Sequence, residues 1–250
     1  MRIRLIATLT CFLFLLSSCD TLQQMSTGQN GVPGKSGTES TGTVTSVEAA
    51  SGIKQALSQG LDKSIKSLAV TDGFLGNAAV KILMPPEAQK IESALRGLGL
   101  GALADNFIAS MNRAAESAVS EAVPVFTSAL SQLTIRDATT ILLSGQQDAA
   151  TEFFKRTTTN ELASRFSPIV EKALSKHNVT KYWSDLVTRY NQLPLVNEKI
   201  EADLNKYVTG KAIDGLFHQV AQEELRIRQN IGGSRSTPLL KKVFEYADKN

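Results

Sequence analysis

Three polar side chains interrupt an alanine-rich, otherwise apolar stretch, and their types and spacing could do chemistry. They are Asn112, Arg113 and Glu116, and Arg156 and Arg165 could meet such carboxylates from neighbouring helices. A guanidinium group binds carboxylate and phosphate oxygens in a bidentate geometry, so one interpretation is a site for an anion or a polar headgroup. The interpretation that the sequence favours is a polar network between helices that binds nothing.

A second polar set lies later in the chain. Asp214 and His218 are four residues apart, and Lys211 shares their stripe if the segment is helical. A histidine oriented by a carboxylate can act as a general base. However, Ile213 and Leu216 belong to an opposite, apolar face. We therefore expect the polar set to be the solvated side of an amphipathic helix, and we assign no catalytic residue.

Other site chemistries lack the residues they need. Asp72 and Asn77 supply too few oxygens for a calcium loop, and the chain's two histidines lack a ligand spacing for a metal ion. The glycines at 97, 99 and 101 follow a predicted helix and not a strand, so they indicate a connection between helices and not a dinucleotide-binding turn. We expect no metal and no cofactor, and a binding module is favoured over an enzyme.

The N-terminus has the pattern of an export signal. Arg2 and Arg4 precede an apolar run at residues 5–16, and small residues lead from it to Cys19. About 20 apolar residues are needed to span a bilayer, so this shorter run fits a signal sequence. It resembles a bacterial lipoprotein signal peptide, and the resemblance implies cleavage after residues 1–18 and acylation of Cys19, with palmitate among the lipids.

The resemblance also implies a compartment. Acyl chains would hold the protein on a membrane, facing the periplasm. Asp20 follows Cys19, which resembles the inner-membrane retention signal of enterobacterial lipoproteins and favours the inner over the outer membrane. Cys11 would be discarded with the signal, so the mature chain would form no disulfide. The net charge of +3 includes no basic run, and we expect no nucleic-acid partner.

Residues 19–47 and 48–250 differ in composition. Glycine, serine, threonine, glutamine and asparagine dominate residues 26–46, and such a chain buries too little apolar surface to fold. We interpret residues 19–47 as the lipidated cysteine with a flexible tether whose root-mean-square reach is about 30 Å. Residues 48–250 are long enough for one domain with a sizeable core.

The apolar residues of this domain recur at helical spacing, which predicts an all-α, multihelical bundle of about eight or nine helices. Four details are specific enough to check. A helix over 102–133 should kink or break at Pro124, with Leu103 on its buried side. Separate helices are expected at 148–158 and 160–176. Glu224 and Arg228 should be an exposed ion pair.

Several separate segments match one family in the same order. They are DGFLGN at 72–77, LR at 95–96 with Leu103, NRAAE at 112–116, FKRTT at 154–158, YVTGKAIDGLF at 207–217 and LLKKVF at 239–244. Over residues 50–246 the chain resembles the domain of unknown function 4197 family of bacterial exported proteins. The family carries no established activity, so the resemblance implies a fold and a compartment but transfers no role to a residue.

Three functions remain open at this stage. The first is a tethered binding or envelope-structural module with an envelope protein as partner. The second is a carrier of a lipid or another small hydrophobic ligand in a cavity between helices. The third is a hydrolase that uses a residue such as Glu116 or His218. We rank them in this order, because signatures of catalysis are missing and the tether is long.

Overall fold

A computed structural model describes residues 43–176, 179–191 and 203–250 of the protein. Every regular element in this part is helical, so the prediction of an all-α, multihelical fold is confirmed. Cys19, the predicted signal peptide and the tether up to residue 42 lie outside the described residues, and their assignments stay predictions.

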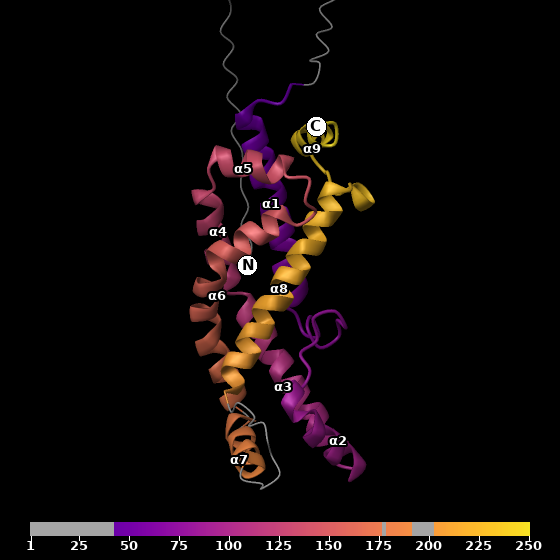
Figure 1. The fold of residues 1–250 in the computed structure, drawn as a ribbon, viewed down its shortest axis with the longest axis vertical. Coiled ribbons are helices and arrows are strands. Elements are labelled where there is room, and N and C mark those ends of the chain that lie inside the picture. Colours follow the sequence, from indigo (N-terminus) through magenta and orange to yellow (C-terminus); the bar gives the residue numbers. More distant parts are fainter. Residues whose placement is uncertain (1–42, 177–178, 192–202) are drawn as a thin grey trace, which may run out of the picture. The chain divides into compact units, whose positions relative to one another are not determined.

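The described part contains nine α-helices and two short 3-10 helices (Figure 1). In chain order they are α1 Ser46–Leu68, η1 Pro86–Ala88, α2 Gln89–Gly97, α3 Gly101–Val119, α4 Ala122–Gln132, α5 Ile135–Leu143, α6 Ala149–Ser175, α7 Val179–Asn191, α8 Leu204–Arg228, η2 Ile231–Gly233 and α9 Pro238–Ala247.

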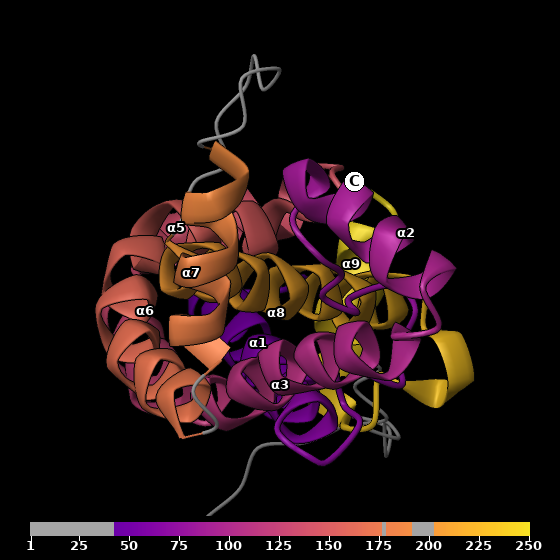
Figure 2. The same cartoon turned by 90° about the horizontal axis from the view of Figure 1, so that it is seen from below.

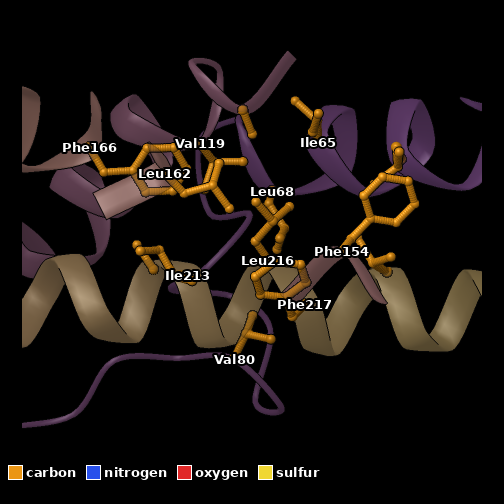
Figure 3. Packing of buried hydrophobic residues seen from close by; sticks show 14 of the residues in the cluster. Ile65, Leu68, Val80, Val119, Phe154, Leu162, Phe166, Ile213, Leu216 and Phe217 are labelled. Atoms are coloured by element: carbon orange, nitrogen blue, oxygen red, sulfur yellow. The ribbon is translucent and has the colours of Figure 1, made fainter. Parts of the chain in front are cut away.

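The three helices α3, α6 and α8 pack closely on one another, and α1 lies against both α5 and α8 (Figure 2). Aromatic rings join them inside: Phe126 of α4 meets Phe154 of α6 and Phe217 of α8 edge to face, with ring centroids 5.7 and 6.0 Å apart. Figure 3 shows Phe154 and Phe217 in this apolar core. Such edge-to-face pairs are favourable because a positive ring edge meets a negative ring face.

Several helix ends are set by local residues. Thr134 and Asp137 form the capping box that begins α5, and Thr237 caps α9 directly before Pro238. Each threonine hydroxyl accepts a backbone N–H that the helix itself leaves unpaired. The predicted helix over 102–133 is broken between α3 and α4, shortly before Pro124, as that proline requires.

The predicted break at residue 159 is wrong, because α6 runs without interruption through Thr158 and Asn160. Its threonine hydroxyls donate to carbonyls one turn earlier, as Thr158 does to Phe154 at 2.7 Å, so they are satisfied inside the helix. Buried Leu162 and Phe166 continue the core-facing stripe, and their packing outweighs the low helix propensity of the threonines.

The expectation of a surface pair at Glu224 and Arg228 is also wrong. The two side chains do pair, at 2.9 Å, but both are largely buried. Glu224 also accepts the backbone N–H groups of Ala150 and Thr151 at 3.0 and 2.8 Å. These N–H groups are the second and third of α6, whose own N-cap residue, Asp148, makes no side-chain cap. Glu224 therefore caps α6 from a different helix.

Glu48 connects the first and last helices. It completes the capping box of α1 with Thr45, and Lys242 of α9 donates to its carboxylate at 2.6 Å. The Lys242 ammonium, with the Thr45 bonds, lowers the pKa of Glu48 to about 2.

Because this pKa is depressed in the folded state, the ionised carboxylate stabilises the fold above its unfolded pKa of about 4.5. That contribution is lost as the pH falls towards 2. We expect melting temperatures of the wild type and of Glu48→Gln to converge between pH 4.5 and 2, whereas at pH 7 the wild type is the more stable. A difference that is independent of pH would contradict this assignment.

Candidate functional site

A non-helical segment connects α1 to η1, and part of it passes through the interior of the domain. Phe74 in this segment is fully buried, as are the side chains of Ile82 and Met84. Turns pair part of this backbone, for example the N–H of Asn77 with the Phe74 carbonyl at 3.1 Å, but the N–H groups of Phe74 and Ile82 take their acceptors from outside the segment. Two polar residues of α3 supply these acceptors.

Glu116 of α3 pairs the first part of the segment. Its carboxylate accepts the backbone N–H of Phe74 at 3.1 Å and of Leu75 at 3.3 Å. Arg113 donates to the other oxygen of Glu116 and to Asp72, each at 2.7 Å. These carboxylates, Glu116 above all, raise the pKa of Arg113. The charge of a buried carboxylate is thus compensated by one guanidinium and two backbone dipoles.

Asn112 pairs the second part of the segment. Its side-chain oxygen accepts the N–H of Ile82, and its side-chain nitrogen donates to the Ile82 carbonyl, both at 2.8 Å. The same nitrogen donates to the carbonyl of Ile108 within α3 at 2.7 Å. The Asn112 amide therefore makes the same pair of hydrogen bonds to Ile82 that a neighbouring β-strand would make. These bonds hold the extended piece at 81–85 against α3.

The ring of Phe74 needs a matching hollow on α8, which Gly215 provides. A Cβ atom at position 215 would lie 2.6 Å from Cε1 of Phe74 and 3.2 Å from Cβ of Val80. No side chain larger than hydrogen fits there without displacing the ring. Figure 3 shows Val80 close to α8, near Leu216 and Phe217.

The fixed segment forms one wall of an open groove, and α8 forms the other. The groove has a volume of about 510 Å³, and its polar lining is Lys81, Gln89, Tyr207, Lys211, Asp214 and His218. The Tyr207 hydroxyl donates to the Leu83 carbonyl at 3.1 Å and joins the two walls. Lys211 lies 5.9 Å from the Tyr207 ring centroid and 4.0 Å from the Asp214 carboxylate.

Two further hollows lie beside α8 and share Asp214 with the groove. One, of about 300 Å³, is bounded by Pro85, Pro86 and Trp183, and the other, of about 390 Å³, by residues of α6. Both include Gly210, whose missing side chain leaves the helix surface open, with no atom within 4 Å of a Cβ built there. A partner backbone could approach the helix closely at this point.

The predicted site residues fall into two groups. Asn112, Arg113 and Glu116 act together, but they bind the protein's own backbone and Asp72. The structure does not bring Arg156 or Arg165 to them. Arg156 lies 5.7 Å from the Phe153 ring centroid, and Arg165 donates to Glu161 one turn away on the same helix.

The groove itself was missed by the analysis of the sequence. Its α8 wall is the polar stripe of Tyr207, Lys211, Asp214 and His218, which the sequence shows at helical spacing. The opposing wall comes from residues 79–86, which are distant in sequence and not helical, so no periodicity joins them to α8. The available sequence signal was that both walls lie in or beside segments that match the family, at 72–77 and 207–217.

The structure also places the residues considered for catalysis and for ligand binding. Asp214 and His218 are exposed, and the Asp214 carboxylate lies 4.0 Å from the Lys211 ammonium. In the described part of the chain, no three histidine, cysteine or acidic side chains gather closely enough to hold a metal ion. The single tryptophan, Trp183, is buried and packs on Phe107 with ring centroids 5.2 Å apart, so its ring contributes to the core.

These features define an all-helical domain in which a buried irregular segment and a long helix build one open groove. The family described as "Protein of unknown function (DUF4197)" matches residues 43–245, and the chain belongs to this family. No curated protein and no solved structure matches the chain. Among the helices of residues 43–176, 179–191 and 203–250, none combines the length and apolar character that a membrane span needs.

We expect Glu116→Ala to destabilise the fold, because the backbone N–H groups of Phe74 and Leu75 lose their acceptor. The free energy of unfolding should fall by about 1–3 kcal/mol for each buried donor left unpaired. The matched control is Glu152→Ala on the exposed face of α6, which should change it by less than about 0.5 kcal/mol. Equal effects in urea unfolding would contradict a pairing role for Glu116.

Two glycines on α8 provide an internal comparison. Gly215→Ala drives a methyl group into Phe74, and we expect a loss of about 1–3 kcal/mol. Gly210→Ala meets nothing, and it should raise stability by about 0.5–1 kcal/mol through helix propensity. Thermal unfolding of both variants measures the difference, and similar melting temperatures would show that α8 does not need the hollow at Gly215.

Proposed function

We propose that this protein is a lipoprotein of the cell envelope, anchored through acylated Cys19 and facing the periplasm, and that its domain is a non-enzymatic binding module. The anchor is supported by the basic start, the short apolar run and the small residues before Cys19. Asp20 supports the inner membrane as its location.

The groove along α8 is the observation that carries the binding function. One wall is anchored to α3, since Asn112 pairs the N–H and the C=O of Ile82 at 2.8 Å, and Glu116 fixes the backbone just before this wall. The other wall presents Lys211, Asp214 and His218 to solvent, where they contribute little to the core. A rigid scaffold that displays exposed polar groups along an open concave surface is the usual form of a recognition site.

The carrier alternative would need an apolar cavity between helices. Among the described residues, the apolar hollow lined by α1, α5, α6, α8 and α9 has a volume of about 20 Å³, about the space of a single water molecule. The groove reaches the roughly 300–1,000 Å³ of small-ligand pockets, but it is open to solvent and partly polar. We therefore propose a partner that binds on the surface, namely another protein of the envelope.

The anchor is tested by replacing the cysteine. Mass spectrometry of the mature N-terminus should find acyl chains on Cys19, and the wild type should fractionate with membranes. Cys19→Ala should be neither acylated nor retained on membranes. A Cys19→Ala protein that stays with the membrane fraction as the wild type does would contradict an acyl anchor at this residue.

The groove is tested by photocrosslinking in cells. A crosslinking amino acid at position 211 should capture a defined partner, whereas the same group at Lys155, on the exposed side of α6, should not. Lys211→Glu should weaken affinity for the purified partner at least about tenfold, which corresponds to about 1.4 kcal/mol. Equal capture from both positions would contradict the groove as the binding surface.

A further inference from the structure

The turn between α2 and α3 exposes an unusual run of apolar residues. Residues 97–104 contain only glycine, leucine and alanine, and three leucines lie on the surface. Leu98 is 75 % exposed, Leu103 57 % and Leu100 45 %. Leu103 was predicted to be buried, and that prediction is wrong, because Ala104 and Ile108 form the buried side of α3 there and Leu103 faces solvent. Single exposed leucines are common, but a contiguous set indicates a contact surface.

The turn is held in one shape by charges at its base. Arg96 donates to Glu92 at 2.8 Å on α2 and to Asp105 at 2.7 Å on α3, so it joins the two helices. Both carboxylates nearest to the leucines are thus paired with the same guanidinium. The leucines are presented by a braced hairpin, and no charged or hydrogen-bonding side chain lies among them.

Part of the backbone of the turn is also hydrogen-bonded internally, as an apolar environment requires. The N–H groups of Gly99, Leu100 and Leu103 donate to carbonyls within the hairpin at 3.1, 2.8 and 3.0 Å. An unpaired backbone group is costly in hydrocarbon, so this internal pairing lowers the cost of insertion. Gly101 and Ala102 begin α3, and the N–H groups of a first helical turn suit the phosphate oxygens of lipid headgroups.

We propose that this α2–α3 turn inserts into the interface of the bilayer that carries the protein's own acyl anchor. The inference rests on the proposed anchor at Cys19. The absence of polar side chains in the turn favours lipid over a protein partner, because specific recognition of a protein uses hydrogen bonds as well as apolar contact. The domain would then touch the membrane at two places, the anchor and the turn.

Chain length allows this second contact. The turn follows α2, which lies at the end of the described part opposite to the start of α1 (Figure 1). The 23 residues at 20–42 separate Cys19 from the described domain. A fully extended chain of this length spans up to about 80 Å. The longest described helix, α6, has 27 residues and is about 40 Å long at 1.5 Å per residue. The extended chain is therefore about twice as long as this helix. The anchor therefore leaves the turn free to reach the bilayer.

Fluorescence of the mature, acylated protein in phospholipid vesicles tests the proposal. Acylation removes the only remaining thiol, so Leu98→Cys can be labelled at one site with an environment-sensitive dye. We expect the emission of the dye to shift to the blue with vesicles and to be quenched by spin labels on the lipid acyl chains.

The control is Val70→Cys, an exposed apolar position elsewhere on the domain, where the dye should keep the emission that it has in water. Adding Leu100→Ser and Leu103→Ser should reduce the shift at position 98 without changing the melting temperature.

Each outcome decides the question. A shift at position 98 that needs vesicles supports insertion. Water-like emission at position 98 in protein that floats with the vesicles contradicts the inference and leaves the anchor intact. A shift without vesicles shows that the turn contacts a second copy, which also contradicts it. Protein that fails to float contradicts the anchor, and the inference fails with it.

Discussion

The structure depends on pairing the backbone of one irregular segment inside an otherwise helical domain. Helices pair their own N–H and C=O groups, but in the chain between α1 and η1 turns pair only part of the backbone, and the buried residues Phe74 and Ile82 need acceptors from elsewhere for their N–H groups. Asn112 and Glu116, one turn apart on α3, supply the missing partners. The segment in turn forms a wall of the groove, so the exposed surface is a product of hydrogen bonds made in the interior.

Much of the fold was predictable because its signals are local. The caps at Thr134 and Thr237 and the break before Pro124 each need only a few neighbouring residues. The partners of Asn112 and Glu116 were not predictable, since they are backbone groups 30 to 42 residues away. The role of Glu224 was wrongly predicted for the same reason. Its partner Arg228 is one helical turn away and can be inferred from spacing, whereas the N-terminus of α6 is more than 70 residues away in the sequence.

One helix serves the interior and the surface at once. Along α8, Gly215 receives the buried ring of Phe74, while Lys211 and Asp214 face the open groove. The segment at 207–217 thus packs against the core with one face and exposes charged side chains on the other. This explains why it contains both glycine and charged residues. Amphipathic spacing alone identified the exposed stripe, but only the fold shows that a second wall lies opposite.

The cap that Glu224 places on α6 has a consequence for the order of folding. The two partners are 73 residues apart, so the first turn of α6 cannot be completed until nearly the whole chain has been synthesised. Contacts between distant parts of a chain form late, because closing a long loop costs entropy before the contact returns any stability. A chain emerging from its N-terminus would therefore keep this end of α6 unfinished, and α8 would close the domain as one of the last steps.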